Sequence, residues 1–376
     1  MKLKKIKITI SVLILSTLCL FLLLFKPTAY ADTPGFSVVP SVGKNQIKPG
    51  LGYFNLLLKP NQSQKLEFTI YNNGSKDLKV KTTFGTAFTG DAGNVLYTPE
   101  KYRSDQSLKI NIKDYVKLPK NVTIPAHSKS IVEAEVTMPA EEFKGVIAGG
   151  FNFNEIDIGS NKSKTAASKS STSITNLYSY VIGLVLQNSE DTIQPTLNLK
   201  EVGASQRNSR NIFSAKLENS ASTYLLNMDV DAVVTSFKDK KIKYSFNNSS
   251  MEMAPNSNFD LAVPVSIQGV PKENETSQPL KPGKYQISMT IFGGKNENGK
   301  YQKLVNGQVT NYDYKWTFNK SFIVTGKQSK QLNSKDVTIN QNKENSWVLY
   351  ILITLVVLLM IIIFILLYKS KNKKES

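Results

Sequence analysis

The chain has 376 residues, 40% of them hydrophobic, with 47 lysines and arginines against 29 aspartates and glutamates. At about 150 residues per domain this length predicts roughly two domains, and the 18 phenylalanines and 16 tyrosines are enough to build cores. A single cysteine and a single histidine exclude a disulfide framework and a cysteine- or histidine-rich metal site, and they argue against histidine-based catalysis. We therefore expect no catalytic residue, no metal and no cofactor.

The first 31 residues have the features of a secretory signal peptide. Four lysines precede an uncharged, mostly apolar run over residues 8–25, and Ala29-Tyr30-Ala31 matches an A-x-A cleavage site. The same run could instead be an uncleaved anchor. Cys19 follows Leu18, where a lipoprotein signal needs a small residue, so we expect the mature chain to contain no cysteine.

Residues 32–326 carry the alternation of apolar and polar residues that is typical of strands with one buried face. Leu66, Phe68 and Ile70, for example, alternate with charged or hydroxyl-bearing residues. Similar runs occur at 132–136, 213–217, 228–234, 259–265 and 285–291. Almost no helical periodicity separates them, which predicts an all-β fold of two tandem immunoglobulin-like β-sandwich domains.

A loose internal repeat supports two sandwiches of one design. Each half contains an asparagine turn, then a proline turn, then a glycine corner that enters a strand. These elements lie at 70–74, 124–128 and 143–147 in the first half and at 217–220, 254–258 and 281–285 in the second. Turn chemistry alone could also produce this order, because proline fixes φ and asparagine and glycine tolerate positive φ.

We expect the first sandwich to span residues 32–188 and the second to span residues 189–326. The almost continuous apolar run at 177–186 suits a central strand of the first sandwich, and a polar joint follows it. Residues 159–173 have the composition of a linker. Because the strand after them still needs the first sheet, we interpret them as a loop within the first domain.

The C-terminal part predicts a membrane anchor. Residues 327–346 are polar and are interpreted as a stalk. Residues 347–368 form an uncharged run of 22 residues, and a helix of that length reaches ~33 Å, enough to span a bilayer core of ~30 Å. The lysine-rich residues 369–376 place the tail in the cytoplasm. With no LPxTG-like motif before the run, we expect a single-pass protein of the cell membrane whose N-terminal ectodomain lies at the cell surface.

The predicted ectodomain is basic. The formal charge of the whole chain is +18; without the five lysines of the signal and the net three positive charges of the tail, residues 32–346 keep +10. Such a surface is attracted to anionic wall polymers such as teichoic acids, or it provides only general solubility. Nucleic acid is excluded as a partner by the extracellular compartment.

No sequence pattern points to a catalytic or metal centre. His127 lies in a Pro-Ala-His-Ser turn. The acidic pairs Glu141-Glu142 and Glu190-Asp191 are adjacent in sequence, whereas a glycosidase needs two opposed carboxylates and neighbours in a strand point to opposite faces. Residues 91–94 (DAGN) fail the calcium-loop pattern and are interpreted as a hairpin turn.

Two segments are candidates for binding. Residues 138–150 combine an aromatic residue, a base and three glycines, and strand glycines mark either a bulge or the close approach of another chain or polymer. Residues 254–259 either line a sugar site with their amides and aromatic ring or form a capped turn. The candidate residues are Phe143, Lys144, Gly145, Gly149 and Gly150 in the first segment and Asn256 and Asn258 in the second. We expect Gly145→Trp to impair partner binding without unfolding the first domain.

Several segments also carry a family resemblance. Residues 51–60, 68–73, 138–139, 143–150 and 180–184 resemble the peptidoglycan-binding domain of WxL-interacting proteins. Residues 195–199, 253–259, 280–285 and 316–318 are similar to that family's host-binding domain. The order of signal, two domains, helix and basic tail matches the family as well.

The resemblance implies a non-enzymatic scaffold on the surface of a Gram-positive bacterium. The first domain would bind peptidoglycan, the ectodomain would hold WxL-domain surface proteins, and the second domain would contact host proteins. Tyr53 lies in a matched segment and joins the candidate binding residues.

Two other functions remain open at this point. One is a carbohydrate-binding accessory module of a glycan-degrading system, in which Tyr53, Phe54, Tyr97 and Tyr102 would form an exposed aromatic plane. The other is a membrane-anchored assembly chaperone for surface proteins, which would differ from a scaffold by releasing its client.

Overall fold

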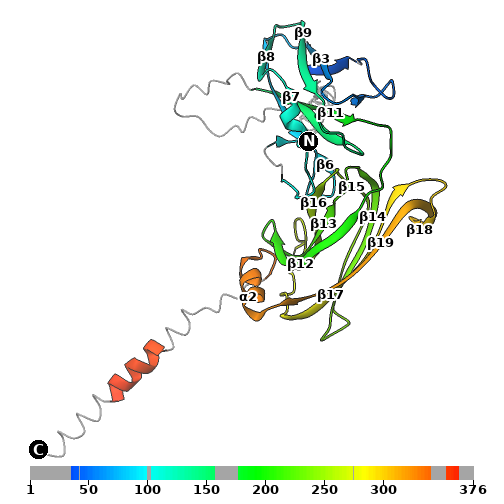
Figure 1. The fold of residues 1–376 in the computed structure, drawn as a ribbon. Coiled ribbons are helices and arrows are strands. Elements are labelled where there is room, and N and C mark those ends of the chain that lie inside the picture. Colours follow the sequence, from blue (N-terminus) through cyan, green and yellow to red (C-terminus); the bar gives the residue numbers. More distant parts are fainter. Residues whose placement is uncertain are drawn as a thin grey trace, which may run out of the picture.

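The computed structural model describes residues 35–41, 43–99, 103–156, 177–273, 275–339 and 353–363. Its body consists of two β-sandwiches that follow one another along the molecule (Figure 1). The predicted signal peptide, Cys19 and the loop at 159–173 lie outside the described residues.

Among the described residues, the first sandwich is built from nine strands in two sheets. They are β1 (Phe36–Ser41), β2 (Phe54–Leu57), β3 (Ser63–Asn72), β4 (Leu78–Thr86), β7 (Val116–Lys117), β8 (Asn121–Ile124), β9 (Lys129–Thr137), β10 (Ile147–Glu155) and β11 (Ser179–Gln187). One sheet has the order β1-β3-β9-β7 and the other the order β2-β11-β10-β4-β8. The hairpin of β5 (Phe88–Thr89) and β6 (Val95–Leu96) and the 3-10 helix η2 (Ile112–Tyr115) connect β4 to β7.

Alternation along the strands places the first core between these sheets. In β3, Leu66, Phe68 and Ile70 are at most 1% exposed, whereas the residues between them face outward. The ring of Phe68 lies 4.8 Å from that of Phe151 and 5.0 Å from that of Phe153, both on β10 of the opposite sheet. Aromatic contacts of this kind join the two sheets and bury a large apolar area.

The second sandwich has eight strands. They are β12 (Leu197–Arg207), β13 (Arg210–Asn219), β14 (Leu225–Ser236), β15 (Lys243–Met253), β16 (Ser257–Pro264), β17 (Gly283–Lys295), β18 (Tyr301–Val305) and β19 (Gln308–Val324). The sheets have the orders β12-β13-β16 and β15-β14-β17-β19-β18. Phe213, Tyr285 and Phe322 meet in their core, with ring centroids 5.1–5.8 Å apart. The all-β prediction is thus confirmed for the described residues.

Residues 327–339 belong to the second sandwich, so the prediction of a polar stalk is wrong for them. The helix α2 (Gly326–Lys335) lies against this domain at the end remote from the first (Figure 1). Ser329 Oγ and Asn333 Nδ2 donate to the carbonyl oxygen of Leu280 at 2.5 and 2.9 Å. Leu332 is the one apolar side chain that α2 packs on the second core, so the helix docks largely through hydrogen bonds and has the polar composition expected of a stalk.

A further helix covers residues 353–363, within the predicted membrane anchor. None of the helices among the described residues is both long and apolar enough to span a membrane. The other residues of the predicted span, 347–352 and 364–368, lie outside the described part of the chain.

A hydrogen-bonded clamp closes one end of the first sandwich. The side-chain amide of Asn72 donates to the carbonyl oxygens of Lys76 and Pro125 at 2.8 and 3.0 Å, and its Oδ1 accepts the N–H of Gly74 at 2.9 Å. The N–H of His127, which has a φ of 50°, donates to the Gly74 carbonyl at 3.1 Å. The asparagine turn therefore binds the proline turn, and His127 is a turn residue.

The second sandwich repeats this clamp. The amide of Asn219 donates to the carbonyl oxygens of Thr223 and Ala254 at 2.7 and 3.1 Å, and its Oδ1 accepts the N–H of Ala221 at 3.4 Å. The N–H of Asn256, with a φ of 48°, donates to the Ala221 carbonyl at 3.0 Å. Because the same bonds join the same two turns, the sequence repeat corresponds to a repeated structural element.

Asn219→Ala is expected to destabilise the second sandwich by about 2–3 kcal/mol, because two carbonyl groups would lose their donor in a buried turn. Asn72→Ala should act in the same way on the first sandwich. Scanning calorimetry of the full chain measures both transitions. Asn319, an exposed asparagine bonded to Ser288 Oγ at 2.7 Å, provides the control. Equal transition temperatures for Asn219→Ala and Asn319→Ala would show that the clamp contributes nothing.

Candidate functional site

A row of three glycines crosses the outer face of the five-stranded sheet in the first sandwich. Gly85 on β4 pairs with Gly150 on β10, and Gly150 pairs with Gly183 on β11. Tyr97 lies over the first two: a Cβ atom on Gly85 would overlap the Tyr97 carbonyl oxygen, and one on Gly150 would lie 2.8 Å from the Tyr97 ring. These two glycines therefore allow the chain around Tyr97 to lie flat on the sheet.

Gly183 differs from the other two glycines in the space around it. The nearest atom to a Cβ atom at this position would be the Cβ of Tyr53 at 3.5 Å, an ordinary contact distance. Packing within the described structure therefore does not require glycine there. Val181 and Val185 lie on either side of Gly183 and face the same way, because side chains alternate along a strand. The three residues form an apolar surface with a recess at its centre.

This surface is the floor of a cleft of about 680 Å³ between the two sandwiches. The volume falls within the range of small-molecule sites. The first domain lines the cleft with Gly52, Tyr53, Val95, Leu96, Tyr97, Thr98, Val181, Gly183 and Val185, and the second with Tyr224, Leu226 and Glu252. Tyr53, Val181 and Leu226 remain 39%, 47% and 46% exposed, so large apolar side chains stay accessible there.

The polar groups of the cleft gather where the two domains meet. The hydroxyl oxygens of Tyr97 and Tyr224 lie 3.5 Å apart. Burial raises the pKa of the Tyr97 hydroxyl, with a smaller contribution from the charge of Glu252. Burial, followed by the proximity of Tyr97, raises the pKa of Tyr224 well above its ordinary value. Both hydroxyls therefore stay protonated at neutral pH, next to a carboxylate that accepts hydrogen bonds.

Direct contacts hold the second domain against this face. The hydroxyl oxygens of Thr89 and Ser257 lie 2.6 Å apart, and the N–H of Ala254 donates to Thr89 Oγ1 at 3.0 Å. The N–H of Glu252 donates to the carbonyl of Gly93 at 2.7 Å. Glu252 lies at the end of β15 and also lines the cleft. The end of this strand therefore both binds the first domain and provides the carboxylate of the cleft.

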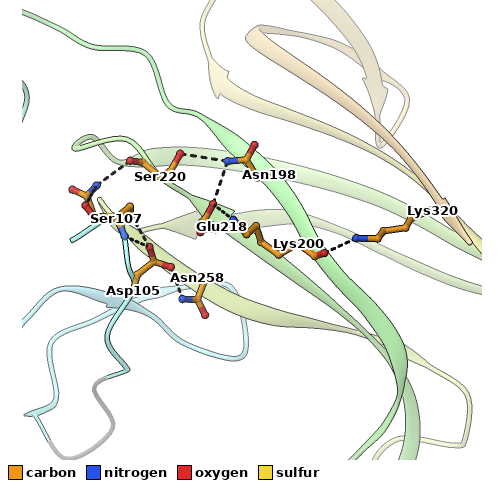
Figure 2. Close-up of polar contacts among 9 residues, drawn as sticks. Asp105, Ser107, Asn198, Lys200, Glu218, Ser220, Asn258 and Lys320 are labelled. Carbon is orange, nitrogen blue, oxygen red and sulfur yellow. Dashed lines mark hydrogen bonds and ion pairs between the residues drawn. The ribbon is translucent and has the colours of Figure 1, made fainter. Parts of the chain in front are cut away.

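The contacts between the two domains, which we call the joint, also include a polar network around Asp105 (Figure 2). Asp105 of the first domain accepts a hydrogen bond from the side-chain amide of Asn258, and Asn256 Nδ2 donates to the carbonyl oxygens of Ser107 and Ser220 at 3.2 and 3.0 Å. Burial raises the pKa of Asp105, but the bonds from Ser107 and Asn258 lower it more, so the net pKa lies below its ordinary value. Asp105 therefore acts as a charged acceptor across the joint.

Gly145 lies in this joint as well. Its φ is +81°, a conformation that side-chain-bearing residues rarely adopt. A Cβ atom would overlap the carbonyl oxygen of Ser222 and lie 2.7 Å from Ile193 Cδ1. The N–H of Val146 donates to the same Ser222 carbonyl at 2.7 Å. A backbone therefore approaches Gly145 closely, but it belongs to the second domain of the same chain rather than to another chain or polymer.

The candidate residues of segment 138–150 serve mainly the fold. Phe143 packs on the first core, and its N–H donates to Asn188 Oδ1 at 3.1 Å. Lys144 is exposed. Gly149 faces inward, where a Cβ atom would lie 2.7 Å from the Gly85 carbonyl oxygen, and Gly150 lies beneath Tyr97.

The other candidates fall into two groups. Asn256 and Asn258 hold the joint, so the capped-turn interpretation fits them better than an open sugar site. Tyr53 lines the cleft together with Tyr97, as two members of the expected aromatic plane. Phe54, a third member, is 1% exposed in the first core, and Tyr102 lies outside the described residues.

Sequence reasoning missed the contribution of the second domain to the cleft. Tyr224 and Leu226 follow the asparagine turn at 217–220, and Glu252 precedes the proline turn at 254–258. Both turns are elements of the sequence repeat, but nothing in the sequence indicates that they face the first domain. Among the described residues, no group of three or more histidine, cysteine, aspartate or glutamate side chains is placed to hold a metal ion.

The chain has weak similarity to solved structures and no match among curated proteins. A chaperone–tip adhesin complex of CFA/I fimbriae is 11% identical, with 70% of this chain and 93% of that chain covered and a TM-score of 0.28. The E. coli chaperone DraB is 12% identical, with 77% and 97% covered and a TM-score of 0.26. A PapD-like domain of human CEP192 is 12% identical, with 45% and 94% covered and a TM-score of 0.25. These scores are too low to bear on function.

Two family models match the chain in consecutive segments. Residues 36–155 match the WxL Interacting Protein peptidoglycan binding domain, and residues 169–334 match the WxL Interacting Protein host binding domain. The second match begins ahead of β11, although β11 pairs with β10 of the first sandwich. Together the matches cover well over half of the chain in the family's order, and the chain therefore belongs to the WxL-interacting protein family.

Proposed function

We propose that this protein is a non-enzymatic cell-surface scaffold that binds peptidoglycan through its first domain and protein partners through its second. The observation that carries the proposal is the cleft whose floor is Val181, Gly183 and Val185 and whose walls include Tyr53 and Tyr97. In the described structure this site combines the accessible ring of Tyr53 with convergent hydroxyl groups. The matched peptidoglycan-binding family supports the choice of ligand.

A binding role suits this cleft better than hydrolysis. Enzymes that cleave glycosidic bonds use a pair of carboxylates on opposite sides of the bond. The described lining supplies one carboxylate, that of Glu252, together with tyrosine hydroxyls that stay protonated. The groups present can therefore hold a ligand by stacking and hydrogen bonding.

The second domain has an exposed arm that suits contact with proteins. The strands β18 and β19 extend from the sheet as a hairpin whose turn, Asn306-Gly307, has φ values of 49° and 80° (Figure 1). Leu304 and Val309 pair opposite each other near its tip and are 67% and 66% exposed. The host-binding family match supports host extracellular proteins as partners, and WxL-domain surface proteins follow from the family's name.

Display at the surface completes the proposal. The apolar run at 347–368 would anchor the chain in the cell membrane after removal of the signal peptide, leaving both sandwiches outside. An anchored chain with several weak wall contacts is retained far longer than any single contact would allow, because each further contact forms within one complex.

Co-sedimentation with peptidoglycan sacculi tests the wall role. The full chain in a mild detergent is mixed with washed sacculi stripped of teichoic acid, at low salt and at physiological salt. We expect pelleting to persist at physiological salt, where surface charges more than about 8 Å apart are largely screened. Pelleting that disappears at physiological salt would reduce wall association to the +10 charge of residues 32–346 and would contradict the proposal.

A further inference from the structure

The cleft belongs to both domains. Its floor and one aromatic wall come from the first sandwich, but Tyr224, Leu226 and Glu252 of the second close the opposite side. Gly93, Thr89 and their partners on the second domain fix this arrangement through hydrogen bonds of 2.6–3.0 Å. The position of the second-domain side chains is therefore set by the joint and does not depend on a ligand.

We propose that this interdomain cleft binds the N-acetylated glycan strand of the cell wall, and that the second domain completes the site with Tyr224 and Glu252. The proposal rests on the proposed peptidoglycan-binding function and locates it. Wall recognition is then a property of the two-domain unit, although the family model for peptidoglycan binding covers the first domain alone.

The chemistry of the lining fits an acetylated pyranose chain. Tyrosine rings stack on the apolar faces of sugar rings, and Tyr53 and Tyr97 stand on the two sides of the recess at Gly183. The valine floor offers an apolar surface for acetyl methyl groups. The Tyr224 hydroxyl can donate to a sugar oxygen, and the Glu252 carboxylate can accept from a sugar hydroxyl or an acetamido N–H.

Charge distinguishes this ligand from other wall components. The described residues that line the cleft include one carboxylate and no lysine or arginine. A phosphate-rich teichoic acid or the carboxylates of a stem peptide would meet a negative group there, although the ectodomain as a whole is basic. The cleft is therefore complementary to the uncharged face of the glycan.

Gly183 offers a clean test of occupancy. Gly183→Val would fill the recess with a residue that strands favour, and its Cβ atom meets only Tyr53 at an ordinary distance. Gly203→Val on β12 is the matched control, because that strand glycine also has open space and lies outside the cleft. We expect Gly183→Val to weaken binding of the full chain to glycan strands freed of stem peptides by more than about tenfold, and Gly203→Val to leave it unchanged.

Conservative variants test the second domain. Tyr224→Phe removes one hydroxyl and Glu252→Gln removes one charge, and neither changes the shape of the side chain. Each is expected to weaken glycan binding by about three- to tenfold, with both calorimetric transitions unchanged. Wild-type affinity in both variants would restrict the site to the first domain and would overturn this part of the proposal.

The outcomes separate the inference from the function on which it rests. If the wild-type chain pellets with sacculi and Gly183→Val pellets equally well, peptidoglycan binding stands and the cleft is not its site. If free stem peptides bind and glycan strands do not, the cleft recognises another component and the proposal fails. If the wild-type chain does not pellet at physiological salt, the proposed function itself fails.

Discussion

Replacing Gly145 with alanine is expected to open the joint between the two sandwiches. The new Cβ atom would overlap the carbonyl oxygen of Ser222 and crowd Ile193, and alanine would have to adopt a φ of +81°. Overpacking of this kind costs about 1–3 kcal/mol, and opening the joint relieves it, so we expect the closed arrangement to lose about that much stability relative to the open one. Small-angle scattering should show a larger radius of gyration, and glycan binding should fall because Tyr224 and Glu252 leave the cleft.

Gly269 provides a control that separates the backbone strain of a positive φ from the steric overlap of the new Cβ atom. It has the same φ of +81° but no atom within 4 Å of a Cβ position, so Gly269→Ala carries the strain without the contact. We expect its radius of gyration and glycan affinity to match those of the wild type. An unchanged radius of gyration in Gly145→Ala would contradict the role assigned to this glycine.

Removing the Asp336 carboxylate is expected to produce the second large effect, on the stability of the second sandwich. Asp336 is 2% exposed and accepts hydrogen bonds from Asn211 N–H at 2.7 Å, Ser266 Oγ at 2.5 Å and Thr338 N–H at 2.9 Å. Asp336→Ala would leave these buried donors without an acceptor, at a cost of about 3 kcal/mol or more. The second calorimetric transition should move to lower temperature, whereas the first should not.

The same carboxylate predicts how stability depends on pH. Burial raises the pKa of Asp336, but the bonds from Ser266 and Thr338 lower it more, and the net pKa lies below its ordinary value. A carboxyl with a lowered folded-state pKa stabilises the fold above about pH 4 and loses that contribution as the pH falls through the folded-state value. Asp336→Asn should therefore weaken the decline of the second transition below pH 4. A decline identical to that of the wild type would contradict this assignment.

Strand positions could be predicted well from the sequence, because burial on one face imposes alternation. Leu66, Phe68 and Ile70 alternate in sequence and all three are buried in β3. The apolar run at 177–186 was expected in the first sheet, and β11 pairs there with both β10 and β2. Such patterns show which face of a strand is buried, and they can be recognised from a few neighbouring residues alone.

Docking of α2 could not be predicted in the same way. The helix contacts the second sandwich through the bonds of Ser329 and Asn333 to Leu280 and through Leu332 on the core. One apolar residue and a few hydrogen bonds leave no apolar period in the sequence. Asp336 lies within the predicted stalk, but its carboxylate accepts hydrogen bonds from Asn211 and Ser266 of the second sandwich.

The part of the candidate site that lies on the first domain could be predicted from the sequence, but the part on the second domain could not. The sequence indicates Tyr53 and Tyr97 as candidate exposed aromatics, whereas Phe54, next to Tyr53, points into the first core because it begins β2. Tyr224 and Glu252 have no distinguishing neighbours in sequence. Their role follows from the joint, in which turns from two domains meet. Contacts such as Tyr97–Tyr224 and Thr89–Ser257 join residues 127 and 168 positions apart and leave no local pattern.

The most direct test of the central claim, that the interdomain cleft binds the wall, is a methyl NMR titration of the full chain with glycan strands. We predict that the methyl signals of Val181, Val185 and Leu226 shift together as glycan is added, since all three line the cleft. Val39 and Ile131 offer an internal comparison, because they are 50% and 62% exposed on the outer face of the four-stranded sheet. Shifts confined to Val39 and Ile131 would contradict the claim and place the glycan on that sheet instead.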